Sequence, residues 1–162
     1  MKINAIQTEA SIVNGPGLRI PIYVQGCGHG CEGCHNPQTH DRNAGYCISP
    51  KALASIILGH LEDDPLLTGI TWSGGEPMDQ IDDVNAVNEL IVRERPDINI
   101  MLYTGYVMTP AILMMLRHVE YVVDGPFILV QRDIGLKFRG SANQQVWQKR
   151  GNEYVNITEL WR

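Results

Sequence analysis

Three cysteines are crowded into eight residues of the sequence, at Cys27, Cys31 and Cys34. At spacings of four and three residues their side chains can point into one concave loop, and soft thiolates at this density suit an iron–sulfur cluster or zinc. A four-iron cluster has four corners, so three cysteines leave one iron without a protein ligand and free to bind a small molecule. The stretch therefore predicts a metal centre with these three thiols as ligands.

A structural zinc site is a competing interpretation, because zinc in such sites takes four protein ligands. His29, His35 or His40 could supply the fourth. Cys47 offers another alternative, since a fourth cluster ligand would close the open iron and make the protein a ferredoxin-like electron carrier. Otherwise Cys47 is expected to be a small buried residue. The cysteine loop alone leaves these interpretations open.

Three further loops carry residues that could bind a ligand. Paired glycines at Gly74 and Gly75 let a ligand approach the backbone closely, and Glu76 beside them could accept a hydrogen bond from a cationic amine. Thr104 offers a hydroxyl, and Asp124 could hold a ribose hydroxyl. Each signal is weak alone, but their order after a three-cysteine loop predicts one site built from four loops.

The elements that must position these loops alternate between strands and helices. Ser49 and Pro50 have the types of an N-cap and first turn, and Pro96 ends a later helix. Pro21 lacks a backbone donor, which predicts that the first of these strands lies at an edge of the sheet. We expect strands at 19–24, 70–72, 98–103 and 121–123, and helices at 50–61, 78–94 and 110–118.

This alternation predicts an α/β fold with a mostly parallel sheet and right-handed crossovers. Four loops then lie at the carboxyl ends of successive strands, where α/β folds bind ligands. About four or five such units fit into 162 residues, whereas a closed eight-unit barrel needs about 250. We therefore expect residues 1–162 to form a single domain, an open partial (β/α) barrel whose open flank can admit a protein loop.

Composition and charge exclude several classes of protein. With 13 basic and 18 acidic residues the net charge is −5, which argues against a nucleic-acid-binding protein. No run of apolar residues is long enough to span a membrane, and the N-terminus lacks the regions of a signal peptide. Thiols crowded this closely suit a metal in a reducing compartment better than disulfides. A cytoplasmic protein is expected.

The motifs resemble a known superfamily. The Cys-x3-Cys-x2-Cys loop after the first strand, followed by Gly-Gly-Glu-Pro at 74–77, resembles the radical S-adenosylmethionine superfamily. Smaller features resemble the activating proteins of the anaerobic class of ribonucleotide reductase. These are Asn14-Gly15-Pro16-Gly17, Gly33-Cys34-His35-Asn36, Tyr103-Thr104-Gly105-Tyr106, Asp124-Gly125 and Arg139-Gly140-Ser141-x-Asn143-Gln144.

Two departures from the pattern of that resemblance are present. Gly33 stands where the superfamily usually has an aromatic residue. This activase family commonly has glycine there with Tyr after the cysteine, and His35 replaces that Tyr, as a histidine does in the pyruvate formate-lyase activating enzyme. Pro126 replaces a basic residue that the family often carries. A contact between position 126 and the cofactor is therefore in question. Activation of a different glycyl-radical enzyme remains an alternative, as does a zinc-stabilised interaction domain.

The resemblance implies the cofactors and their residues. Cys27, Cys31 and Cys34 would bind a [4Fe–4S] cluster whose open iron is chelated by S-adenosylmethionine. Reductive cleavage would give a 5′-deoxyadenosyl radical, which generates a glycyl radical on anaerobic ribonucleoside-triphosphate reductase. A low-potential donor such as a flavodoxin or ferredoxin would supply the electron, and no catalytic side chain is expected beyond the cluster and cofactor. The residues implied in cofactor binding are Gly33, Cys34, His35, Gly74, Gly75, Glu76, Thr104 and Asp124.

Overall fold

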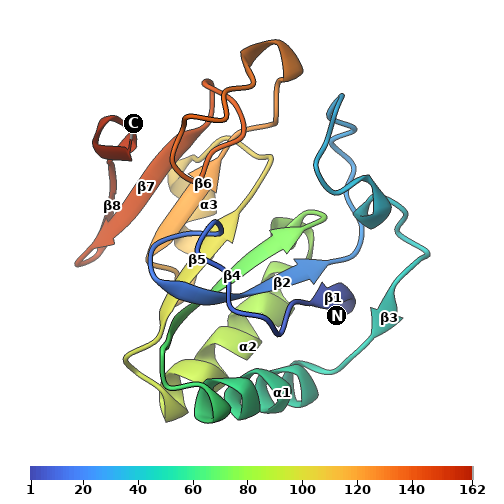
Figure 1. The fold of residues 1–162 in the computed structure, drawn as a ribbon, viewed down its shortest axis with the longest axis vertical. Coiled ribbons are helices and arrows are strands. Elements are labelled where there is room, and N and C mark those ends of the chain that lie inside the picture. Colours follow the sequence, from blue (N-terminus) through green and yellow to red (C-terminus); the bar gives the residue numbers. More distant parts are fainter. Residues whose placement is uncertain (162) are drawn as a thin grey trace.

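A computed structural model describes residues 1–161, and one eight-stranded sheet runs through them in the order β3-β1-β2-β4-β5-β6-β7-β8 (Figure 1). The strands are β1 (Lys2–Ile6), β2 (Leu18–Val24), β3 (Tyr46–Cys47), β4 (Leu67–Gly74), β5 (Asn99–Tyr103), β6 (Tyr121–Asp124), β7 (Gln145–Arg150) and β8 (Glu153–Asn156). The helices are α1 (Pro50–Asp63), α2 (Ile81–Glu94) and α3 (Pro110–Met115), with short 3-10 turns η1 (Pro37–Thr39), η2 (Pro77–Gln80), η3 (Leu129–Gln131) and η4 (Thr158–Trp161).

The sheet is mixed, so the α/β class is confirmed but the expected mostly parallel pairing is wrong. The central strands β2, β4, β5 and β6 are parallel to one another. Antiparallel strands flank them, β1 and β3 on one side and β7 and β8 on the other. The β7–β8 hairpin turns at Gly151, whose φ of 62° suits a tight turn that reverses the chain. Residues near both ends of the chain thus extend a parallel centre with antiparallel strands.

Strand β2 lies inside the sheet and not at an edge, which corrects the expectation drawn from Pro21. Its neighbours are β1 and β4. The carbonyl of Pro21 accepts from the Gln7 backbone N–H at 2.9 Å, so the proline nitrogen also faces the β1 side. Strand β1 ends at Ile6, just before this point. The missing donor of Pro21 therefore falls just beyond the last residue of β1, where its absence does not interrupt the ladder.

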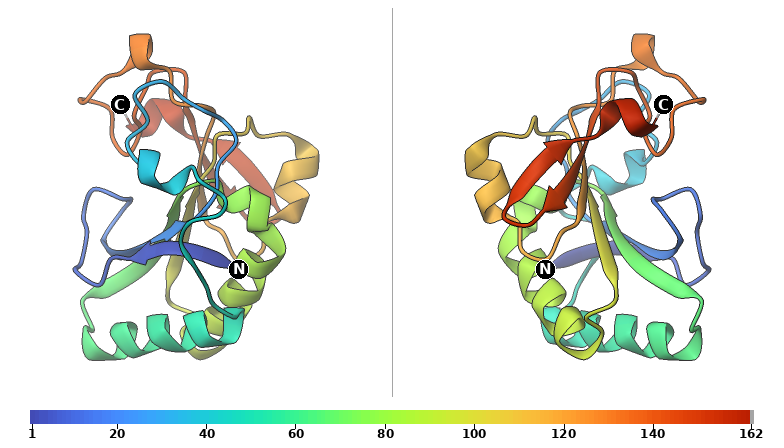
Figure 2. Two further views of the ribbon diagram at one scale, coloured as in Figure 1. Left: turned by 90° about the vertical axis from the view of Figure 1, so that its right-hand side faces the viewer. Right: turned by 90° about the vertical axis from the view of Figure 1, so that its left-hand side faces the viewer.

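The helices pack on one face of the sheet. Alternation along β2 directs Ile20, Ile22 and Val24 into the main core, where they join buried residues of α1 and α2. Figure 2 shows α2 and α3 on the same side of the sheet. In α2 the apolar residues at 81, 84, 87 and 91, which recur at helical spacing, are buried. Burial of these apolar residues fixes the register of the strands. The register in turn fixes where the carboxyl end of each strand lies relative to its neighbours.

Helix boundaries follow local signals with two exceptions. The Ser49 hydroxyl accepts from the Ala52 N–H at 3.2 Å, which confirms the predicted start of α1. The predicted helix at 78–94 begins with the 3-10 turn η2 and becomes α-helical only at Ile81. Helix α3 ends at Met115, earlier than expected, because Leu116 is extended and His118 has a φ of 60°. Within residues 1–161, no helix has both the length and the apolar character needed to cross a membrane.

The other face of the sheet contains a fully buried arginine, Arg19. Its Nε donates to Thr71 Oγ1 at 2.7 Å, and its Nη1 donates to the Pro16 carbonyl at 2.7 Å. Its Nη2 donates to the carbonyls of Ile70 at 2.6 Å and Asn99 at 3.1 Å. Burial lowers the pKa of Arg19 to about 10, so the guanidinium stays charged at neutral pH. One side chain therefore ties the loop before β2 to β4 and β5.

Replacing Arg19 by methionine is expected to lower the free energy of unfolding by about 3 kcal/mol or more, because buried carbonyls lose their donors. The measurement is urea unfolding followed by circular dichroism. Arg93→Met, at an exposed position of α2, is the control and is expected to change the same quantity by less than about 0.5 kcal/mol. Equal unfolding midpoints for the two variants would contradict the role assigned to Arg19.

Candidate functional site

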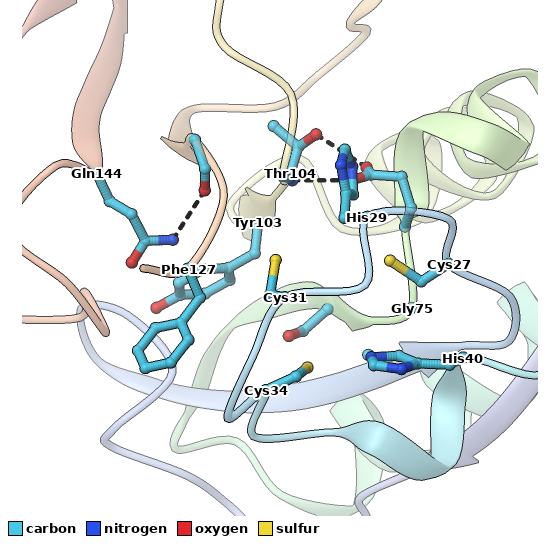
Figure 3. A pocket seen from close by; sticks show the side chains of 15 residues that line it. Cys27, His29, Cys31, Cys34, His40, Gly75, Tyr103, Thr104, Phe127 and Gln144 are labelled. Atoms are coloured by element: carbon cyan, nitrogen blue, oxygen red, sulfur yellow. Dashed lines mark hydrogen bonds and ion pairs between the residues drawn. The ribbon is translucent and has the colours of Figure 1, made fainter. Parts of the chain in front are cut away.

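Four loops meet in one pocket at the carboxyl ends of the parallel strands. The cysteine loop follows β2, and the other loops follow β4, β5 and β6 (Figure 3). The pocket is open and has a volume of about 110 Å³, so a larger ligand would stand partly above its rim. The lining residues are Cys27, His29, Cys31, Cys34, His40, Ser73, Gly74, Gly75, Glu76, Tyr103, Thr104, Gly105, Gly125, Phe127 and Gln144.

The cysteine loop is held to the fold by its own backbone. Gly26 N–H donates to the Thr39 carbonyl at 2.8 Å, and Cys27 N–H donates to the His40 carbonyl at 3.2 Å. These bonds close the loop at its base, so that the chain leaves β2 and returns beside it. The Asn36 N–H lies 3.4 Å from Cys34 Sγ, as a donor to that sulfur. Backbone hydrogen bonds thus order the cysteine loop, and its three cysteine sulfurs lie in the lining of the pocket.

The three loop thiols are free and half-buried. Burial raises the pKa of Cys27, so a bound cation is needed to hold that sulfur as a thiolate near neutral pH. Within residues 1–161, no three His, Cys, Asp or Glu side chains converge closely enough to hold one metal ion. A four-iron cluster takes one thiolate at each of several corners and does not require convergence on a single point. The donor set, three thiols around one pocket, fits such a cluster.

Glycine is required where the loop after β4 meets the cysteine loop. Glu76 N–H donates to the Gly26 carbonyl at 2.8 Å. A Cβ on Gly75 would lie 2.3 Å from that same carbonyl oxygen, which is far inside contact distance. Gly74 has a φ of 95°, in the region that favours glycine. The predicted pair of glycines therefore lets two strand ends approach within hydrogen-bonding distance beside the thiols.

Glu76 is almost completely buried, and both of its carboxylate oxygens are engaged. Oε1 accepts from the Met78 N–H at 2.9 Å and from the Thr104 hydroxyl at 2.8 Å. Oε2 accepts from the Gly105 N–H and lies 2.8 Å from His29 Nε2. Burial raises the pKa of Glu76, and these hydrogen bonds act in the opposite direction. The carboxylate expected to meet a cationic amine thus already joins three loops of the protein.

His29 has a structural connection that the sequence did not reveal. Its ring contacts Glu76 and packs edge-on against Tyr106, with ring centroids 4.7 Å apart. A Cβ on Gly105 would lie 2.5 Å from the His29 ring. The imidazole therefore fills the space between the cysteine loop and the loop after β5. Its position two residues after Cys27 was visible in the sequence, but its partner 47 residues away was not.

The remaining predicted residues lie around the pocket and not in its lining. Asp124 is buried, and its two oxygens accept from the backbone N–H groups of Met108 at 2.6 Å and Gln145 at 3.2 Å. Gly33 and His35 are exposed residues of the cysteine loop. Their contact with a cofactor remains a prediction, as does that of Asp124.

Cys47 is exposed on β3, which corrects the expectation that it is buried. Strand β3 is a two-residue strand at the edge of the sheet, and among the described residues it pairs with β1 alone. The thiol is not among the residues that line the pocket. This placement gives no support to its role as a fourth cluster ligand.

The segment at 139–144 supplies a pocket residue that sequence reasoning did not assign. Gln144 Nε2 donates to the Gly125 carbonyl at 3.0 Å, and its Oε1 accepts from the Gly140 N–H at 2.8 Å. Figure 3 shows Gln144 and Phe127 on the side of the pocket opposite His40. The distinctive Arg-Gly-Ser-x-Asn-Gln motif thus fastens the loop after β6 and forms one wall of the site.

Comparisons with known proteins agree with this arrangement. The model of a family described as a 4Fe-4S single cluster domain matches residues 13–147. Three relatives carry the name anaerobic ribonucleoside-triphosphate reductase-activating protein. That of Vibrio cholerae is 37% identical over 83% of this chain and 90% of its own length. Those of Escherichia coli K12 and Enterobacteria phage T4 are 36% and 31% identical, over 83% of this chain and 91% and 86% of their own lengths.

One solved structure is also similar in part, the crystal structure of QueE from Escherichia coli. It aligns with a TM-score of 0.46 and 17% identity, covering 64% of this chain and 52% of QueE.

Proposed function

The chain belongs to the family of anaerobic ribonucleoside-triphosphate reductase-activating proteins, and on that premise we propose that it generates a glycyl radical on such a reductase. It does so with a [4Fe–4S] cluster and S-adenosylmethionine. When bound, the cluster would pass one electron to S-adenosylmethionine, which would give methionine and a 5′-deoxyadenosyl radical, and this radical would take a hydrogen atom from a glycine of the reductase to become 5′-deoxyadenosine. The protein's own contribution is to bind, orient and shield.

One observation carries the proposal: three free thiols and the Gly-Gly-Glu backbone line the same pocket. Cys27, Cys31 and Cys34 would each hold one iron of the cluster. The fourth iron then remains for the amino and carboxylate groups of S-adenosylmethionine, beside Gly74 and Gly75. Gly75 lies against Gly26, and Gly74 lies against Tyr23, so the loop after β4 packs directly beside the cysteine loop.

Other residues have supporting roles in this proposal. Glu76 holds the loops together, and its carboxylate would also accept a hydrogen bond from the methionine portion of S-adenosylmethionine. Gly33 and His35 would contact the cofactor from the cysteine loop. Thr104 and Asp124 lie at the ends of β5 and β6 and would position the rest of the cofactor. Thr104 lines the pocket, whereas Asp124 would act through the loops whose N–H groups it holds.

The fold is proposed to be an open partial (β/α) barrel made by residues 1–162 as a single domain. Four parallel strands with helices on one face support this, and antiparallel strands flank them on both sides. The low volume of the pocket leaves a cofactor partly above the rim, where a protein substrate can reach it.

The electron donor is proposed to be a flavodoxin or ferredoxin. Free half-buried thiols suit a reducing cytoplasm.

The test uses the protein reconstituted anaerobically with iron and sulfide and then reduced. Two results are expected: cleavage of S-adenosylmethionine to methionine and 5′-deoxyadenosine, and a glycyl signal in electron spin resonance on added reductase. Adding S-adenosylmethionine is expected to change the spectrum of the reduced cluster, because it binds the open iron. Bound zinc without sulfide, together with no cleavage, would contradict the proposal and favour an interaction domain.

A further inference from the structure

The hydrogen-bonding capacity of the Glu76 carboxylate is fully used within the protein. An ionised carboxylate has about four acceptor sites on its two oxygens. Oε1 accepts from the Met78 N–H and the Thr104 hydroxyl. Oε2 accepts from the Gly105 N–H and from His29 Nε2, both at 2.8 Å. Only 1% of Glu76 is exposed. A cationic amine can therefore reach this carboxylate only after one of the four donors has left it.

Three of these four donors are fixed by the fold, and His29 is the exception. The N–H groups of Met78 and Gly105 belong to the backbone of η2 and of the loop after β5. Thr104 is buried, and its hydroxyl oxygen also accepts from the Tyr106 N–H at 3.1 Å. The imidazole of His29 is a side-chain donor on the cysteine loop, and 21% of that side chain is exposed. Rotation about its side-chain bonds would free the carboxylate oxygen without moving the backbone.

His29 and a cationic amine offer the carboxylate the same kind of contact, an N–H donor. Because an ionised Glu76 only accepts hydrogen bonds, His29 Nε2 carries the shared proton. The ammonium group of an amino acid also brings a permanent positive charge to this buried carboxylate. His29, Glu76 and the three loop thiols line one pocket, and Figure 3 shows the His29 ring on the Thr104 side of it. An amine bound in the pocket therefore competes with His29 for one acceptor site.

Tyr106 supports the His29 ring in its contact with the carboxylate. The two rings pack edge-on, with centroids 4.7 Å apart. The Tyr106 hydroxyl donates to Asp79 Oδ1 at 2.9 Å, and Arg42 Nη2 donates to Asp79 Oδ2 at 2.6 Å. Tyr106 and Arg42 are both exposed at the surface. The position of His29 thus depends on a side-chain contact that can be changed without altering Glu76 itself.

We propose that His29 occupies the acceptor site of Glu76 that the amino group of S-adenosylmethionine takes, and that the imidazole leaves this site when the cofactor binds. This inference rests on the proposed function, in which the methionine portion of the cofactor contacts Glu76. Binding must then first break the hydrogen bond between His29 and Glu76. The free energy of that bond is subtracted from the free energy of cofactor binding, so His29 sets the affinity for S-adenosylmethionine.

The experiment compares S-adenosylmethionine with an analogue in which hydrogen replaces the amino group. For each reconstituted protein, the dissociation constants of both compounds are measured by equilibrium dialysis, and iron and sulfide content are determined. His29→Leu removes the donor, and His60→Leu, on α1 and outside the pocket lining, is its control. Tyr106→Leu removes the ring that packs against His29. Tyr106→Phe is the matched control, since it keeps the ring and removes only the hydrogen bond to Asp79.

We expect His29→Leu to bind S-adenosylmethionine about three- to tenfold more tightly than the wild type, which corresponds to roughly one hydrogen bond. Tyr106→Leu is expected to bind it about two- to threefold more tightly, because His29 then leaves the carboxylate more easily. Tyr106→Phe and His60→Leu are expected to keep the wild-type affinity. The analogue without the amino group is expected to bind equally to the wild type and to His29→Leu.

Unchanged or weaker binding of S-adenosylmethionine by His29→Leu would overturn the exchange, and weaker binding would make His29 a residue that holds Glu76 in position. Equal tightening for the analogue would also overturn it, since the effect would not depend on the amino group. If His29→Leu loses its cluster, the comparison of Tyr106→Leu with Tyr106→Phe decides in the same way. A wild-type protein that carries the cluster and does not bind S-adenosylmethionine is a different result, which overturns the proposed function together with this inference.

Discussion

Replacing Cys31 by alanine is expected to reduce cleavage of S-adenosylmethionine by more than about a thousandfold, with loss of most iron and sulfide. The reason is the ligand count, because two thiols cannot hold three corners of a cluster. Cys27→Ala and Cys34→Ala are expected to behave in the same way, since all three sulfurs line one pocket. The measurements are iron and sulfide content after anaerobic reconstitution, the spin-resonance spectrum and the rate of 5′-deoxyadenosine formation.

Cys47→Ala is the matched control for these variants. Cys47 is exposed on β3 and outside the pocket lining, so cluster content and cleavage are expected to match the wild type. Loss of the cluster in Cys47→Ala would make Cys47 a fourth ligand and favour a ferredoxin-like carrier. Full activity of Cys31→Ala would contradict the proposal that all three thiols bind the cluster.

Gly75→Ala is expected to lower kcat/KM for S-adenosylmethionine at least about a hundredfold while the cluster is retained. A Cβ at this position would lie 2.3 Å from the Gly26 carbonyl oxygen, so the loop after β4 must move away from the cysteine loop. A displacement of about 1 Å between reacting groups can cost this much in rate. The thiols lie on the other loop, so iron and sulfide content are expected to remain at the wild-type level.

The control for Gly75→Ala is Gly59→Ala on α1. A Cβ on Gly59 meets nothing within 4 Å, and alanine in a helix is more stable than glycine by roughly 0.5 to 1 kcal/mol. That variant is expected to keep wild-type kinetics with a slightly higher unfolding midpoint. The affinity of Gly75→Ala for S-adenosylmethionine is measured by the spectral change of the reduced cluster. A wild-type value would show that the close approach of Gly75 to Gly26 is not required for cofactor binding.

Local signals in the sequence predicted the helices and central strands well. Ser49 begins α1, and the apolar spacing of α2 gives its buried face, because capping and periodicity depend on residues a few positions apart. The edge position inferred from Pro21 is wrong because it depends on where β1 ends, which is decided by a distant segment. The β7–β8 hairpin was not predicted, although Gly151 marks its turn.

The site was predicted at the level of loops and less well at the level of single contacts. Cys27, Gly75 and Glu76 lie together because carboxyl ends of parallel strands meet at one edge of a sheet. The partner of His29 could not be inferred, since Glu76 is far away in sequence and both residues were expected to have other roles. Gln144 joins the pocket through an antiparallel strand that no alternation pattern indicated.

The backbone bonds that close the cysteine loop at Gly26 and Cys27 have a consequence for damage by oxygen. The cysteine loop follows β2, which pairs with a strand on each side, and its base is closed by backbone hydrogen bonds. None of these contacts requires a bound metal. Destruction of the cluster in air is therefore expected to leave a folded apoprotein. Anaerobic addition of iron and sulfide to that apoprotein is then expected to restore the cluster without a refolding step.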